Sequence, residues 1–253
     1  MRGIVLAGGL GSRLFPLTKV TNKHLLPVYD RPMVFYPIEC LKNAGVVDVL
    51  LVTGGTSAGD FMRLLGDGRD FGLRSITYAY QEGEGGIADA LRLAEPFAAG
   101  ERIIVVLGDN IIQGNVRASA EAFARQPRGA RIVIKRVPDP ERFGVPVFDG
   151  ERIVGIEEKP QQPRSPYAVT GIYFYDNHVF ELIRGLKPSA RGEYEISDVN
   201  NAYLARDALC HDVLEGWWTD AGTFESLLRA GRLVAETGAN HVDGPLDGHG
   251  ESE

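Results

Sequence analysis

Cysteine is scarce in this sequence, with only Cys40 and Cys210 among 253 residues. They stand far apart and form no disulfide framework, metal-ligand spacing or redox motif, so we expect two buried free thiols. Long apolar runs are also missing: residues 46–53 and 103–107 fall well short of the roughly 18 residues that a membrane helix requires, so no membrane span is expected. The first residues show no signal peptide, which favours a cytoplasmic location.

An excess of positive charge is absent too, because 27 lysines and arginines face 34 aspartates and glutamates, for a formal net charge of −7. Nucleic-acid binding requires a clustered basic surface and is therefore not expected. The histidines show no ligand spacing and no nucleophile partner, which argues against zinc chemistry and Ser-His-Asp catalysis. They are His24, His178, His211, His241 and His249.

Short apolar runs alternate with helical periodicity in the first half of the chain. The strands are expected at residues 3–7, 46–53, 75–80 and 103–107, and the helices at 32–44, 59–65 and 87–97. Strands that alternate with helices of about ten residues predict right-handed crossovers. The fold class that follows is α/β, with an open, mostly parallel, doubly wound (Rossmann-like) sheet.

The second half has a different sequence pattern, in which the first predicted strands follow one another without helices between them. This pattern predicts an inserted antiparallel portion. Strands are expected at 131–137, 145–148, 152–157, 168–175 and 208–214, and helices at 196–204 and 223–236. Asp149 and Gly150 form a strong hairpin signal between two of these strands. Residues 1–236 are therefore interpreted as one domain, while the polar, glycine-rich residues 237–253 predict a disordered tail.

A glycine-rich loop, residues 8–14 (GGLGSRL), follows the first predicted strand, where ligands gather at the carboxyl edge of a parallel sheet. It is not a Walker A loop, and Leu14 stands where the dinucleotide fingerprint has its third glycine. A tight turn would explain the glycines alone. The nearby cations Arg13, Lys19 and Lys23 favour a site for phosphate.

Two aspartates stand in small-residue surroundings. Asp109 follows the apolar run 103–107, and Asp220 lies in residues 218–223 (WTDAGT). Together they are able to hold Mg²⁺, which takes one or two carboxylates plus substrate phosphates. For Asp220, a capping role before the last helix is an equally good interpretation.

Two further segments have weaker signals. Residues 157–160 (EEKP) end a predicted strand, and a charged turn is their simplest interpretation. Residues 81–88 (QEGEGGIA) join a strand to a helix and could present backbone groups to a base, although turn chemistry also explains them.

In order along the chain, these motifs resemble the sugar-1-phosphate nucleotidyltransferases. The matching segments are residues 6–18 (LAGGLGSRLFPLT), 23–33 (KHLLPVYDRPM), 107–110 (LGDN), 141–145 (ERFGV), 157–160 (EEKP), 169–173 (VTGIY) and 190–200 (ARGEYEISDVN). The resemblance covers about residues 1–236, and the ordered set is far more specific than any one motif. It implies the nucleotide-diphospho-sugar transferase fold, with a nucleotide-binding part to about residue 125 and a sugar-binding part over about 126–236.

The resemblance is strongest to members that use dTTP and glucose 1-phosphate. It implies that the sugar phosphate attacks the α-phosphorus of dTTP and releases pyrophosphate, with Mg²⁺ as cofactor. Because the nucleophile is already an anion, no general base is needed, and alignment with charge stabilisation suffices. A homo-oligomer is also implied.

Roles carry over position by position from the resemblance. The triphosphate loop would be formed by Gly8, Gly9, Gly11 and Ser12. The catalytic groups would be Arg13, Lys23 and Asp109. The metal ligands would be Asp109 and Asp220. The thymine would be read by Gln81 and Gly86. The sugar phosphate would be bound by Lys159, and the glucose pocket would be lined by Gly144, Glu158 and Val169.

Two alternatives remain. A sister enzyme that uses UTP or CTP would share the phosphate chemistry, whereas a non-catalytic sugar-nucleotide sensor would be expected to lack the metal carboxylates or Lys159. Longer members of the family continue into C-terminal helices that build a regulatory nucleotide site and subunit contacts. This chain ends soon after residue 236, so we expect no separate regulatory site.

Overall fold

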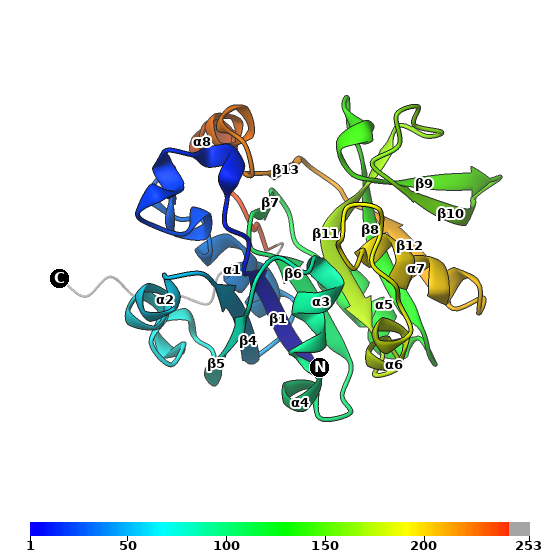
Figure 1. Cartoon of the computed structure of the whole chain (residues 1–253), viewed down its shortest axis with the longest axis horizontal. Helices are drawn as coiled ribbons and strands as arrows, with labels where there is room; N and C mark the ends of the chain where they lie inside the picture. Colours follow the sequence, from blue (N-terminus) through cyan, green and yellow to red (C-terminus); the bar gives the residue numbers. More distant parts are fainter. Residues whose placement is uncertain (243–253) are drawn as a thin grey trace.

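A seven-stranded sheet forms the centre of the computed structural model, which describes residues 1–242 (Figure 1). Its strands, in spatial order, are β12 (Leu209–Val213), β8 (Ala130–Arg136), β11 (Tyr167–Tyr175), β6 (Ile103–Leu107), β1 (Arg2–Ala7), β4 (Asp48–Gly54) and β5 (Ser75–Gln81). Only β11 runs antiparallel to its neighbours β6 and β8. The predicted fold class is confirmed.

The side chains of the central strand β1 are apolar on both faces of the sheet, which explains why helices cover both faces. Ile4 and Leu6 of β1 pack into one apolar cluster, and Val5 and Ala7 pack into another on the opposite face. The first cluster is covered by α3 (Ile87–Arg92), α6 (Val179–Arg184) and α7 (Ile196–Leu204). The second is covered by α1 (Phe35–Asn43), α2 (Ala58–Leu65) and α5 (Arg117–Arg125). Successive side chains on a strand point to opposite faces, so these runs are buried throughout.

The predicted hairpin is present as β9 (Gly144–Asp149) and β10 (Arg152–Glu158), which project from the sheet. The helix expected over 87–97 is instead α3 and a separate α4 (Glu95–Ala98), because Pro96 has no N–H to continue the helix. Helices α5 and α6 were not predicted.

Short elements complete the fold. Two-stranded pairs join β2 (Pro27–Val28) to β3 (Arg31–Pro32) and β7 (Asn110–Ile112) to β13 (Trp218–Asp220). Single 3₁₀ turns lie at Ser12–Leu14, Leu17–Lys19, Lys23–Leu25, Arg69–Phe71 and Pro140–Arg142.

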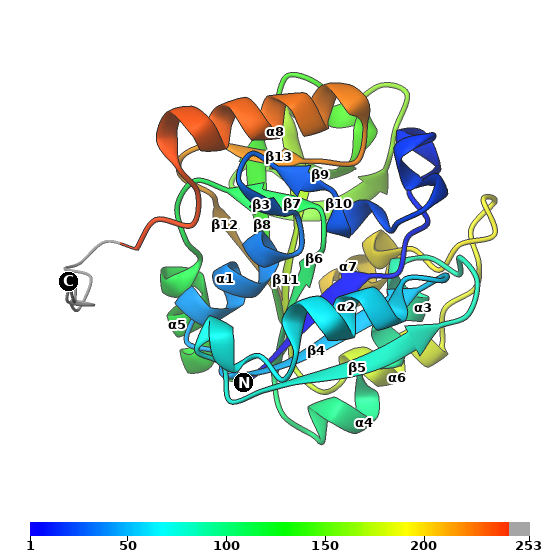
Figure 2. The same ribbon diagram turned by 90° about the vertical axis from the view of Figure 1, so that its left-hand side faces the viewer.

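The last helix, α8 (Phe224–Thr237), lies across β13 at one side of the sheet (Figure 2). Its amino end is closed by a capping box between Thr223 and Ser226. Thr223 is therefore the cap, and the capping interpretation of Asp220 is wrong.

Two expectations require correction. Residues 238–242 are held in place: Asn240 donates from its backbone to Ile112 at 2.9 Å and from its side chain to the Tyr36 carbonyl at 3.0 Å. Disorder from residue 237 onward is therefore wrong for these residues, and 243–253 lie outside the described part. Cys40 is buried as expected, but Cys210 is exposed, because β12 is an edge strand with less cover than the central strands.

Within residues 1–242, no helix combines the length and apolar character that crossing a membrane demands.

Candidate active site

A cavity of about 440 Å³ opens at the carboxyl edge of the parallel strands, between the glycine loop and the β9–β10 hairpin. Of the predicted site residues, those that line it are Gly8, Gly9, Ser12, Arg13, Lys23, Gln81, Gly86, Asp109, Gly144, Glu158, Lys159, Val169 and Asp220. Side chains from both halves of the chain therefore meet in one space, as expected for ligands of open α/β sheets.

Gly11 is the predicted residue that does not line the cavity; it shapes the loop instead. Its φ of 69° lies in the left-handed region, and its carbonyl accepts a hydrogen bond from Thr18 Oγ1 at 2.9 Å. A Cβ at this position would lie 2.8 Å from Cβ of Lys23, which is too close. Glycine is needed here so that Lys23 can reach the cavity.

The two aspartates converge from different strands. The β7–β13 pairing sets Asn110 opposite Asp220, and Asp109 directly precedes β7. A Cβ built on Gly222 would lie 3.1 Å from Asp220 Oδ2 and 3.4 Å from Asp109 Oδ2, so both carboxylates border the same small space. A guanidinium nitrogen of Arg13 lies 3.1 Å from that same point.

Each carboxylate has a basic partner. Lys23 Nζ lies 2.6 Å from Asp109 Oδ2, and one guanidinium nitrogen of Arg142 lies 3.2 Å from both oxygens of Asp220. Burial alone would raise the pKa of Asp109. The Lys23 charge, together with the smaller contributions of His24 and of hydrogen bonds from Lys23 and Asn110, outweighs burial and holds the pKa well below its usual range. The pKa of Asp220 is raised, first by burial and then by the nearby Asp109 charge.

His24 also lines this cavity but is not suited to proton transfer near neutral pH. Burial, followed by the adjacent Lys23 charge, lowers the pKa of His24 to about 3. Its Nδ1 lies 2.7 Å from Asn22 Oδ1 within the protein interior. A base with so low a pKa holds almost no proton at neutral pH and attracts one only weakly.

The donor set suits Mg²⁺ bound together with a substrate. Residues 1–242 contain no cluster of three or more acidic, histidine or cysteine side chains that could hold a metal by themselves. Mg²⁺ commonly takes one or two carboxylates and completes its shell with phosphates and water. Asp109 and Asp220 match that pattern, but two carboxylates are too few for a metal that takes all its ligands from the protein.

Gln81 and Gly86 lie together where β5 passes into α3. The Gln81 amide donates to Asp89 Oδ2 at 2.9 Å. Gly86 has a φ of 96°, and a Cβ there would lie 2.7 Å from the Tyr194 carbonyl oxygen. The conformation and the close approach both require glycine at this junction.

Glu158 and Lys159 line another part of the cavity wall, and Arg191 lies beside Glu158. Glu158 Oε2 accepts a hydrogen bond from Ser197 Oγ at 2.6 Å. Its Oε1 lies 3.7 Å from Lys159 Nζ and 3.6 Å from a guanidinium nitrogen of Arg191. A Cβ on Gly144 would lie 2.9 Å from Ser197 Oγ. Residues 157–160 are thus more than a charged turn, since they bring Lys159 to the cavity.

Lining residues that were missed as site residues include Asn110, Arg142 and Trp218. Asn110 Oδ1 accepts from Gly171 N at 2.9 Å and from Trp218 Nε1 at 2.7 Å, while its Nδ2 donates to Asp109 at 3.1 Å. All three stand within or beside the quoted motifs (LGDN, ERFGV and WTDAGT), which was the available signal.

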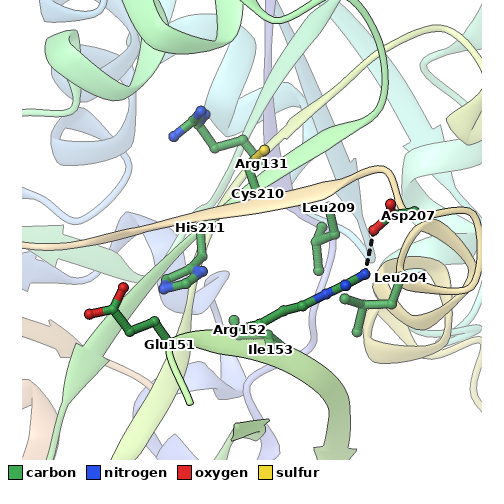
Figure 3. A pocket seen from close by; sticks show the side chains of 9 residues that line it. All are labelled: Arg131, Glu151, Arg152, Ile153, Leu204, Asp207, Leu209, Cys210 and His211. Carbon is green, nitrogen blue, oxygen red and sulfur yellow. Dashed lines mark hydrogen bonds and ion pairs between the residues drawn. The ribbon is translucent and has the colours of Figure 1, made fainter. Parts of the chain in front are cut away.

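A second cavity, of about 390 Å³, lies between β12 and the β9–β10 hairpin (Figure 3). None of the predicted site residues lines it. Its two arginines are already paired, Arg131 with Asp212 and Arg152 with Asp207. The first cavity is therefore the candidate active site.

Comparisons with known proteins agree on one family. Residues 2–237 match the family model described as nucleotidyl transferase. A glucose-1-phosphate thymidylyltransferase of Neisseria meningitidis is 48% identical over 238 residues, which cover 92% of this chain and 82% of that protein. One from Mycobacterium tuberculosis is 45% identical over 237 residues, with the same coverage.

Solved structures give a similar result. A Bacillus anthracis protein, provisionally described as a glucose-1-phosphate thymidylyltransferase, superposes with a TM-score of 0.89 at 51% identity, covering 93% of this chain and 96% of its own. A UDP-glucose pyrophosphorylase complexed with UDP-glucose is only 22% identical but has a TM-score of 0.82, over 93% of this chain and 98% of that one. The second likeness concerns the fold alone.

Proposed function

The chain belongs to the nucleotidyl transferase family, and we propose that it transfers a thymidylyl group from dTTP to glucose 1-phosphate. The products are dTDP-glucose and pyrophosphate. The observation that carries this proposal is the single cavity in which a glycine loop, two convergent carboxylates and Lys159 meet. A non-catalytic sensor would have no need for these groups to converge.

The reaction needs alignment more than it needs a base. An anionic oxygen of the sugar phosphate forms a bond to the α-phosphorus, while the bond from that phosphorus to the bridging oxygen breaks and pyrophosphate leaves with the electron pair. No proton moves in this exchange, which agrees with the low pKa of His24. Catalysis then comes from holding the two phosphates in line and neutralising charge on the leaving group.

The chain's own residues divide this work by position. Backbone N–H groups of the glycine loop would cradle the triphosphate, with Arg13 and Lys23 beside the transferred phosphorus. Asp109 and Asp220 would hold Mg²⁺, which when bound supplies positive charge for the phosphate oxygens. Lys159, which lines the same cavity, would meet the sugar phosphate.

The sugar end offers a hydrogen-bond acceptor in a fixed position. Ser197 orients Glu158 at 2.6 Å, so that the carboxylate can accept from sugar hydroxyls without first reorganising. Gly144 and Val169 line the same region and would shape it around the ring. The homo-oligomeric state and the cytoplasmic location stay predictions.

The test is pyrophosphate release across a panel of dTTP, UTP, dCTP, ATP and GTP with glucose 1-phosphate and other sugar phosphates. We expect Mg²⁺-dependent release with dTTP and glucose 1-phosphate. Strong turnover only with UTP or dCTP would overturn the thymidylyl assignment, and release with no pair would overturn the enzyme assignment.

A further inference from the structure

The carboxylate of Asp89 holds the side-chain amide of Gln81 in one orientation. Gln81 is only 6% exposed, and its Nε2 lies 2.9 Å from Asp89 Oδ2 and 3.4 Å from the Gly86 carbonyl oxygen. A carboxylate and a carbonyl oxygen both accept hydrogen bonds and donate none. The NH₂ group must therefore face these two acceptors, and Oε1 must point the other way.

The carbonyl end of this amide is available to a ligand. Among residues 1–242, no group donates a hydrogen bond to Gln81 Oε1, and Gln81 lines the candidate active site. A Cβ on Gly8 would lie 2.7 Å from that oxygen, so the missing side chain keeps it uncovered. A Cβ on Gly85 would lie 2.5 Å from Asp89 Oδ2, so a second glycine admits the carboxylate.

We propose that Asp89 is a positioning residue that sets base specificity by presenting the carbonyl oxygen of Gln81 to the nucleotide base. The inference rests on the proposed function, in which Gln81 reads the base. An acceptor fixed in this way selects a base whose edge donates there, as N3–H of thymine or uracil does. Cytosine carries an acceptor at N3, so two lone pairs would face each other and neither would be paired.

Asp89 also has structural partners, and the test must separate their effect. It lies in the first turn of α3, where an acidic side chain favours the helix amino end, and its Oδ1 accepts from Arg92 at 2.8 Å. Loss of these contacts would change stability. It would not change the preference for one pyrimidine over another.

The decisive variant is Asp89→Asn, which keeps the shape but replaces the carboxylate with an amide that can turn. Gln81 is then free to offer either end to the base. We expect the ratio of kcat/KM for dTTP over dCTP to fall at least tenfold, mainly through a higher KM for dTTP. Arg92→Gln is the matched control, because it removes an ion pair but keeps the carboxylate; its ratio should stay within twofold of wild type.

If turnover is lost, calorimetry without sugar phosphate measures the dissociation constants of dTTP and dCTP, and their ratio replaces the kinetic ratio. If the Asp89→Asn variant does not fold, Asp89→Ser is measured in the same way. A wild-type enzyme with no activity on dTTP would overturn the proposed function. Active wild type with an unchanged dTTP to dCTP ratio in the variant, or with no preference to begin with, would overturn the role of Asp89 alone.

Discussion

The ammonium group of Lys23 lies 2.6 Å from the carboxylate of Asp109, and each side chain is only 13% exposed. Both charges are thus largely withdrawn from water, and each depends on the other for compensation. Lys23 Nζ also lies 4.0 Å from the position of a Cβ on Gly9, at the edge of the glycine loop. Lys23 therefore lies between Asp109 and the loop that is proposed to hold the phosphates.

We expect Lys23→Gln to lower stability, because breaking a buried pair by removing one partner costs about 3–5 kcal/mol. Mg²⁺ should raise the melting temperature of this variant more than that of wild type, since the metal can replace the missing cation at Asp109. Thermal unfolding with and without Mg²⁺ measures both effects. Lys19→Gln, on the same loop but exposed, is the control. Equal melting temperatures for the variant and this control would contradict the prediction.

Asp109→Asn and Asp220→Asn should each lower kcat by roughly 10²-fold or more while the protein stays folded, because charge stabilisation by a metal is lost. Steady-state kinetics with circular dichroism checks this expectation. Asp139→Asn removes a carboxylate that pairs with Arg142 at 2.7 Å but does not line the cavity, and it should have a much smaller effect. Near-normal turnover of either site variant at saturating Mg²⁺ would refute its ligand role.

Arg13→Ala and Lys159→Ala should impair different kinetic constants. Arg13 lies beside the two aspartates, where charge grows during the transfer, so its loss should reduce kcat. Lys159 would meet a phosphate already charged in the ground state, so its loss should mainly raise KM for glucose 1-phosphate. A dominant effect of Lys159→Ala on KM for dTTP would show that this lysine binds the nucleotide and not the sugar phosphate.

His24 should make the protein less stable as the pH falls. Burial lowers the pKa of His24 from the ordinary value of 6.5 to about 3 in the folded protein, so at a pH between these two values the unfolded chain binds a proton that the folded chain does not. From pH 7 to pH 5 this group alone should remove about 2 kcal/mol of unfolding free energy. Urea unfolding at both pH values should show that His24→Gln loses about 2 kcal/mol less unfolding free energy than wild type does between pH 7 and pH 5. Equal losses of unfolding free energy in wild type and variant would show that His24 does not cause this pH dependence.

Asn240→Ala should destabilise the protein by about 1–3 kcal/mol, because the backbone carbonyl of Tyr36 would lose its side-chain donor in a buried place. The kcat value should change little, since Asn240 does not line the candidate active site. Urea unfolding together with turnover tests both statements. Glu236→Gln, an exposed change on α8, serves as the control and should be neutral.

Sequence alone determined the features that depend on near neighbours. Buried strands at the start of the chain, the glycine loop and the hairpin at Asp149 and Gly150 all follow from local periodicity and turn chemistry. Asp109 was also recognisable, because it stands two residues after an apolar strand and so must lie at the carboxyl edge of the sheet.

Tertiary structure decided which distant groups meet. Asp109 and Asp220 border one space only because β7 pairs with β13, and Arg142 reaches Asp220 only because its 3₁₀ turn lies across the cavity. The hydrogen bond from Asn240 to Tyr36 likewise joins residues far apart in the chain. The composition of the segment that contains Asn240 had suggested disorder. Local patterns encode which face of an element is buried, but the order and register of strands depend on the packing of the whole core. For that reason the sequence indicated the chemistry of the site, and its geometry came from the fold.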